Sequence, residues 1–255
     1  MNIEYYIIDP AGNITALVTT AVPREEYKPV AAFIMKSNKD VEQVGFVNFE
    51  NNNINLNMSG GEFCGNATMS AAALCYSKNG LSGSLNTCVN ASPMPEPIPV
   101  AVSKHGDLFE CTCEVPSPYS IKNYSFTAGG REYRYPLVCF EGIKHIVADS
   151  ELNETAVQSE IKRLSSELNA SALGVMFYNR EKQELKPLVY VSGVDTLYHE
   201  KSCASGSCAV AAAFGDCEKP INISQPGGII TVTDLKGRIR LCNNLKIIKQ
   251  CSEEI

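Results

Sequence analysis

Two cysteines of this chain stand in closely similar surroundings. Cys64 lies in Glu-Phe-Cys-Gly-Asn-Ala-Thr at 62–68, and Cys203 lies in Lys-Ser-Cys-Ala-Ser-Gly-Ser at 201–207. An alanine-rich apolar run follows each motif, so we expect a helix to begin just after each thiol. The unpaired N–H groups at a helix N-terminus favour a thiolate and can hold an anion. Two such thiols facing one carbon could remove a proton from one side and deliver a proton to the other.

This chemistry needs one thiolate and one thiol at the same time. A free cysteine has a pKa of about 8.5, and a helix N-terminus or a nearby imidazole can lower it into the working range. The backbone N–H groups at 65–66 and 206–207 could bind a substrate carboxylate and stabilise the developing negative charge. The structural alternative is that each cysteine is a buried thiol at a close-packed helix start. The small residues beside it are then turn and cap residues, namely Gly65, Ser205, Gly206 and Ser207.

Short β-rich runs dominate the elements that must position these thiols. In the first half they lie at 3–8, 14–19, 44–49, 54–58, 98–103 and 108–115, and in the second half at 133–140, 144–148, 174–178, 188–191, 229–233 and 239–242. Helical periodicity is clear at 153–168, where Val157, Ile161, Leu164 and Leu168 form one stripe and Asn153 can cap the helix. The runs after the cysteines are apolar on nearly every side, which predicts two helices surrounded by protein.

Pro and Gly gather at 92–99 and again at 116–119, near the middle of the chain. We therefore predict a domain junction there, with residues 1–117 carrying Cys64 and residues 118–255 carrying Cys203. The last strand could return to the first domain. The predicted fold class is α+β, with two pseudo-symmetric domains that each wrap a barrel-like sheet around a central apolar helix. The site would lie in the cleft between them.

Composition narrows the choice of partner. The 255 residues are 44% hydrophobic and 20% charged, and the net charge of −6 is spread without long runs. Nucleic acid and membrane surfaces are therefore poor candidates, and a small molecule is the better one. Without a signal segment or an apolar run long enough to span a bilayer, we expect a cytoplasmic protein. The sequence leaves open whether the chain forms a homodimer.

The chain has eleven cysteines, and an odd number cannot form a complete set of intramolecular disulfides. In a reducing compartment most should be free thiols. The close pairs lack the Cys-x-x-Cys spacing of zinc knuckles, so no metal site is expected.

Four motifs resemble those of diaminopimelate epimerases. Residues 64–67, Cys-Gly-Asn-Ala, resemble the Cys-Gly-Asn-Gly of that family, and residues 202–209 resemble its Ala-Cys-Gly-Ser/Thr-Gly-Ala-Cys-Ala. Gly12-Asn13 is similar to its Gly-Asn-Asp-Phe, whose Asn binds substrate. His145 stands where its Asn-Pro-His-x-Val places a histidine beside a catalytic cysteine. The resemblance implies a racemase or epimerase without a cofactor, in which Cys64 and Cys203 are the two bases.

Further site residues follow from this resemblance. It implies that Asn13, Asn57, Gly65, Asn66, Ala204, Ser205, Gly206 and Ser207 bind substrate. His145 would tune one thiol, or else be a satisfied strand histidine. Glu200 could hold the substrate amino group or partner the Cys203 thiol, with Asp195 and His199 as rivals.

The departures from the epimerase pattern bear on the substrate. The motif after Cys64 lacks the family's Arg and second Cys, and no arginine replaces the one that would clamp a distal carboxylate. The motifs 61–68 and 198–203 look more like the histidine racemase branch of this superfamily. Diaminopimelate epimerase and proline racemase stay as alternatives, although proline racemases have His where this chain has Asn66. From another class, the chain could be an amino-acid or metal-binding thiol protein without catalysis.

Overall fold

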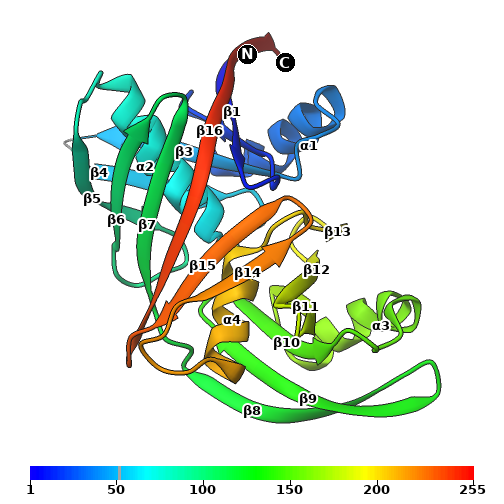
Figure 1. Cartoon of the computed structure of the whole chain (residues 1–255). Helices are drawn as coiled ribbons and strands as arrows, with labels where there is room; N and C mark the ends of the chain where they lie inside the picture. Colours follow the sequence, from blue (N-terminus) through cyan, green and yellow to red (C-terminus); the bar gives the residue numbers. More distant parts are fainter. Residues whose placement is uncertain (51–52) are drawn as a thin grey trace.

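The computed structural model describes residues 1–50 and 53–255. The chain folds as an α+β protein in which strands far outnumber helices, as the short β-rich runs predict (Figure 1). Nearly all strands belong to one continuous ladder of hydrogen-bonded neighbours.

The first part of the ladder closes into a barrel of eight strands. The neighbours follow the order β1 to β7 and then β16, and β16 also pairs with β1. The strands are β1 (Asn2–Pro10), β2 (Thr15–Val18), β3 (Gln43–Glu50), β4 (Asn53–Met58), β5 (Ser84–Ala91), β6 (Ile98–His105), β7 (Leu108–Pro116) and β16 (Arg238–Glu254).

The helix α2 (Gly65–Lys78) contacts every one of the strands β1 to β7. Almost all of its side chains are buried, because its alanines and other small residues allow strands to approach from all sides. The helix that follows Cys64 is thus buried along most of its length against these strands.

The ladder continues from β16 through a second set of strands, which ends at β8 among the described residues. These strands are β15 (Gly228–Asp234), β14 (Ile221–Gln225), β12 (Glu184–Val191), β11 (Ala172–Asn179), β10 (Ile143–Asp149), β9 (Arg131–Phe140) and β8 (Ser120–Ala128), with β13 (Thr196–His199) added beside β12. The helix α4 (Ala204–Phe214) contacts β9, β10, β11, β15 and β16, and it too is largely buried.

Two further helices lie on the outside of the strands (Figure 1). The helix α1 (Tyr27–Ser37), preceded by a short 3-10 turn (Arg24–Glu26), packs against β3. The helix α3 (Glu154–Glu167) packs against β8, β11 and β12 through Val157, Ile161 and Leu164. The Asn153 side chain caps it by accepting a hydrogen bond from the Ala156 N–H at 3.0 Å, as predicted.

The long strand β16 connects the two sets. Its first part pairs with β15 and β7, and its last part pairs with β1 as far as Asn2 and Glu254. One cluster of buried apolar residues includes both α2 and α4. The division of the chain near residue 117 stays a prediction.

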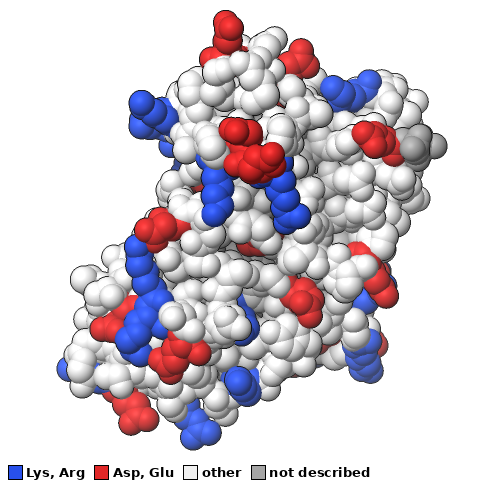
Figure 2. Space-filling view, turned by 180° about the vertical axis from the view of Figure 1, so that it is seen from behind, with Lys and Arg blue, Asp and Glu red and all other residues white. Residues whose placement is uncertain are grey.

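The helices in the described ranges are all too short or too polar to cross a membrane. In the face drawn in Figure 2, charged side chains of both signs are interspersed.

Candidate functional site

Both motif cysteines occupy the position just before a helix. Cys64 precedes α2 and Cys203 precedes α4, each with an extended backbone. The Cys64 Sγ accepts a hydrogen bond from the Ala67 N–H at 3.3 Å, and the Cys203 Sγ accepts one from the Gly206 N–H at 3.4 Å. The predicted placement of a thiol at a helix N-terminus is therefore confirmed twice.

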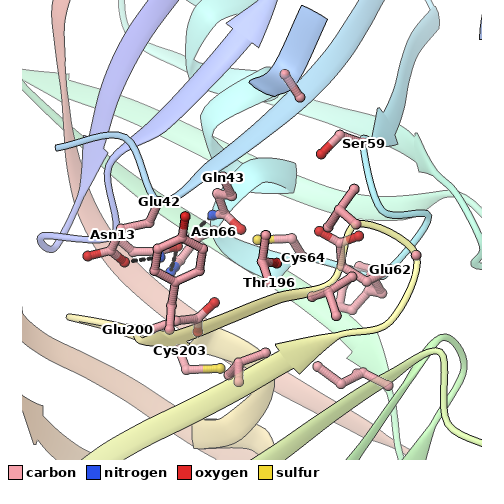
Figure 3. A pocket seen from close by; sticks show the side chains of 18 of the residues that line it. Asn13, Glu42, Gln43, Ser59, Glu62, Cys64, Asn66, Thr196, Glu200 and Cys203 are labelled. Atoms are coloured by element: carbon pink, nitrogen blue, oxygen red, sulfur yellow. Dashed lines mark hydrogen bonds between the residues drawn. The ribbon is translucent and has the colours of Figure 1, made fainter. Parts of the chain in front are cut away.

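The two helix starts also meet. A Cβ atom added to Gly65 would lie 2.9 Å from the Cβ of Ala204, so there is room for only one methyl group at this contact. Both cysteines line a cavity of 380 Å³, together with Gly65, Asn66, Ala204 and Ser205 (Figure 3). The fold thus brings the two distant motifs to one site.

A matched pair of hydroxyl groups fixes the first turn of each helix. Thr68 donates to the Cys64 carbonyl and Ser207 donates to the Cys203 carbonyl, both at 2.8 Å. Gln225 strengthens the second turn, because its Oε1 accepts from the Cys203 N–H at 2.8 Å and its Nε2 donates to Ser207 Oγ at 3.0 Å. Ser207 therefore holds the backbone of Cys203 and does not line the cavity.

Gly206 also lies behind the cavity wall. A Cβ there would come 3.2 Å from the Cys203 Sγ and would overlap the Met176 sulfur. This close approach explains why the position before Ser207 has no side chain.

An amide network joins the first motif to the second. The Asn66 Nδ2 donates to Asn13 Oδ1 at 3.1 Å and to the Ser202 carbonyl at 3.2 Å. Asn13 in turn donates to Glu42 at 2.7 Å and accepts from Gln43 at 2.5 Å. The cavity is lined by Asn13, Glu42, Gln43 and Asn66. Figure 3 shows these four residues together, at the end of the cavity away from Glu62.

His145 lies on β10 and is completely buried. Its Nε2 is 3.0 Å from the Ser205 Oγ, and this hydroxyl is 3.6 Å from the Cys203 Sγ. Burial lowers the pKa of His145 to about 3, so the ring is neutral at physiological pH. The structure thus connects His145 to Cys203 through one intervening hydroxyl.

Three acidic side chains line the cavity: Glu42, Glu62 and Glu200. Burial raises the pKa of all three carboxyl groups, and it raises that of Glu200 to about 8. Glu200 interacts with the Cys203 thiol, which partly opposes this rise.

The pKa values of the two thiols differ from the expectation that a helix N-terminus lowers them. Burial raises the pKa of Cys64 to about 12, with smaller contributions in the same direction from Glu200 and Glu62. The pKa of Cys203 lies well above its ordinary value because of burial and the neighbouring Glu200. The helix N–H groups oppose these effects but do not overcome them, so both thiols are protonated at neutral pH.

The two rivals of Glu200 point elsewhere. Asp195 borders the cavity, but its exposed carboxylate pairs with Lys162 at 2.6 Å and accepts from the Tyr190 hydroxyl at 3.0 Å. His199 is exposed and pairs with Glu154 at 3.0 Å. Glu200 is therefore the acidic residue of this segment that faces Cys203.

The structure does not bring Asn57 to the cavity. It lies on β4 between the buried Leu56 and Met58, so its side chain faces away from the core. Ser59, two residues further on, lines the cavity instead. In the described residues no three His, Cys, Asp or Glu side chains gather as a metal site, and the eleven cysteines are free.

Several cavity residues have no role in the sequence analysis. Glu62 and Phe63 directly precede Cys64, so their place in the first motif is a signal that was available. Glu42 and Gln43 follow α1 at the start of β3, and no local pattern marks them. Thr196 and Tyr198 reach the cavity from β13.

Comparison with known proteins gives the family. The sequence pattern of the histidine racemase CntK N-terminal domain matches residues 2–248. A histidine racemase from Fusobacterium nucleatum subsp. nucleatum is 34% identical over 217 residues, which cover 82% of this chain and 80% of the relative. A histidine racemase from Staphylococcus aureus is 28% identical over 252 residues, covering 91% and 88%.

Solved structures show the same fold at low sequence identity. A predicted epimerase from Pseudomonas aeruginosa superimposes with a TM-score of 0.73 at 9% identity, covering 99% of both chains. A hydroxyproline epimerase from Agrobacterium vitis gives a TM-score of 0.68 at 10% identity, covering 98% of this chain and 92% of the other. With the family pattern spanning nearly the whole sequence, the chain belongs to the histidine racemase CntK N-terminal domain family and is an isomerase.

Proposed function

We propose that this protein is a racemase that interconverts L- and D-histidine without a cofactor, using Cys64 and Cys203 as its two bases. The observation that carries the proposal is the convergence of two helix-start cysteines on one cavity, where Gly65 and Ala204 touch. The names of the relatives support histidine as substrate. The cavity of 380 Å³ is of a size that suits a single amino acid.

The substrate carboxylate would bind at the paired helix N-termini. The first N–H groups of α2 and α4 lack partners within their helices, and both helix dipoles favour an anion there. The same groups stabilise the negative charge that spreads onto the carboxylate when the α-proton leaves.

The reaction needs a thiolate, and Glu200 is placed to generate one. In molecules in which Glu200 is ionised, the Cys203 S–H proton passes to the Glu200 carboxylate, which leaves a thiolate at Cys203. This thiolate takes the α-proton, and the electron pair of the C–H bond stays on the substrate. The Cys64 thiol then delivers its proton to the opposite face of the carbon, so the product has the opposite configuration. The cycle closes when Glu200 releases its proton to solvent and the Cys64 thiolate takes one up. The reverse direction exchanges the roles of the two cysteines.

Other residues act by positioning. His145 is neutral and holds the Ser205 hydroxyl beside Cys203, so it orients the thiol without carrying charge. Asn13 and Glu42 form an acidic, hydrogen-bonding corner that suits the substrate ammonium group. We also propose that residues 1–117 and 118–255 are two similar domains, each built around its cysteine-led helix.

The test is solvent exchange at the α-carbon. The protein is incubated with L-histidine in deuterated buffer, and the α-proton signal and the D-histidine content are followed together. We expect both deuteration and D-histidine. Turnover of LL-diaminopimelate or L-proline instead would overturn histidine as the substrate, and inertness toward a broad amino-acid panel would overturn the racemase proposal.

A further inference from the structure

Glu62 is a buried acid that the proposed proton transfers do not use. It lies in the loop between β4 and α2, is 9% exposed, and lines the cavity. Its Oε2 is shut off from solvent and has no hydrogen-bond partner in the described part of the chain. Backbone groups of Glu62 and Gly60 act on the carboxyl group, but they leave Oε2 without a partner. A buried polar oxygen without a partner is costly, so this atom can accept a hydrogen bond from a donor that arrives with a ligand.

The position of Glu62 shows which part of the ligand it would meet. In Figure 3 the labelled Glu62 lies on one side of Cys64, while Glu200, Asn13 and Glu42 lie on the other. With the α-carbon between the two cysteines and the ammonium group at the Asn13 end, as the proposed function has them, the amino-acid side chain would point toward Glu62.

The surroundings of Glu62 suit a flat ring with a polar edge. Phe63, Val191 and Val194 line the same cavity and supply apolar surface. The loop is closely packed, because a Cβ on Gly193 would come 2.7 Å from the Gly60 carbonyl and one on Gly60 would come 2.5 Å from Glu62 Oε2. The terminal torsion of a glutamate is broad, so a rotation of the carboxyl group can offer either oxygen to a donor.

We propose that Glu62 determines the side-chain specificity of this site by accepting a hydrogen bond from an imidazole N–H of the substrate. The inference rests on the proposed function, because it assumes that an amino acid occupies the cavity. It extends that function by naming the residue that distinguishes histidine from an apolar ring of the same shape.

The expected discrimination is large. A ligand ring without an N–H leaves the buried Glu62 Oε2 without a partner, and sites built to pair such atoms reject analogues that lack the donor by orders of magnitude. Replacing Glu62 by leucine removes the cost of an unpaired buried oxygen. It also removes the group that would accept a hydrogen bond from the imidazole N–H of histidine.

The experiment compares two probes on the whole protein. The KM and kcat for L-histidine are measured by α-deuteration, and β-(2-thienyl)-L-alanine, which has a ring of similar shape without N–H groups, is measured as a competitive inhibitor. In Glu62→Gln we expect the KM for histidine to rise about tenfold or more, with kcat changed less than about threefold. In Glu62→Leu we expect a further rise in this KM and at least about tenfold tighter binding of the thienyl analogue.

Two controls make the result specific. Glu184→Gln changes an exposed glutamate at the start of β12 and should leave both constants unchanged. Glu200→Gln should lower kcat, since that residue acts on the thiol. Circular dichroism checks the fold, and if Glu62→Leu fails to fold, Glu62→Gln decides.

The inference is overturned if either Glu62 variant binds histidine as the wild type does. It is also overturned if the Glu62 variants bind histidine and the thienyl analogue more weakly by the same factor, or if only the kcat for histidine falls. A wild-type protein that is active on histidine but shows one of these results refutes only the role of Glu62. A wild-type protein inert toward histidine refutes the proposed function, and the role of Glu62 with it.

Discussion

Gly65→Ala tests whether contact between the two helix starts sets the geometry of catalysis. The added Cβ would lie 2.9 Å from the Ala204 Cβ and 3.4 Å from Leu241 Cδ1. Carbon atoms in good contact are about 3.5–4.0 Å apart, so α2 and α4 must separate by up to about 1 Å. A misplacement of about 1 Å can cost about 10²-fold in rate, which corresponds to about 2.7 kcal/mol in the activation free energy.

The effect on stability should be smaller. Overpacking costs about 1–3 kcal/mol, while alanine gains up to about 1 kcal/mol over glycine in a helix. The variant should therefore stay folded and lose up to about 2 kcal/mol in the free energy of unfolding, measured by urea denaturation.

The matched control moves the methyl group across the contact. Gly65→Ala combined with Ala204→Gly has the same number of methyl groups as the wild type, so we expect the double variant to recover most of the lost kcat/KM in the α-deuteration assay. Activity of Gly65→Ala within threefold of the wild type would refute the reasoning. A double variant no more active than the single one would refute it as well.

Three further predictions concern the acids and bases of the site. Cys64→Ala and Cys203→Ala should each lower racemisation by about 10³-fold or more, measured by D-histidine formation, and normal turnover of either variant contradicts the two-base mechanism. The pKa of Glu200 is raised to about 8, so kcat/KM should increase as the pH rises through that value and the carboxyl group ionises; a profile flat from pH 6 to 9 would speak against its role. Because the pKa of His145 is lowered to about 3 in the folded state, the unfolded state binds its proton more readily. Below pH 6.5 the free energy of unfolding of the wild type should therefore fall by up to about 1.4 kcal/mol per pH unit relative to that of His145→Gln. Urea denaturation at several pH values measures both free energies, and an equal fall in the two proteins would disprove this.

The cysteine motifs were predictable because helix starts are local. An alanine run with small residues at its beginning specifies a helix, and the residue before it becomes the cap. The stripe and cap of α3 follow from the same kind of signal. By contrast, α1 was missed because it is short and has Pro29 in its first turn, where proline is tolerated but masks the helical pattern.

The proton affinities of the thiols could not be predicted from sequence. The dipole of a helix start is a local property, whereas burial depends on which strands and helices pack around Cys64 and Cys203. The partner of Glu200 and the orphaned oxygen of Glu62 also depend on contacts between distant segments. The alternation of β4 could have placed Asn57 on the outer face, since Leu56 and Met58 are the apolar residues of the same strand.

The course of β16 constrains the order in which the protein can fold. Seven strands of the barrel around α2 precede residue 117, but its closing strand β16 begins at Arg238, and its Glu254 pairs with Asn2. Until β16 emerges from the ribosome, β1 and β7 present unpaired edges that invite wrong pairing. Bringing such distant residues together carries a chain entropy cost whose length-dependent part is about 5 kcal/mol. Closure of the barrel therefore waits until β16 has been synthesised, and folding should be slow for a protein of this size.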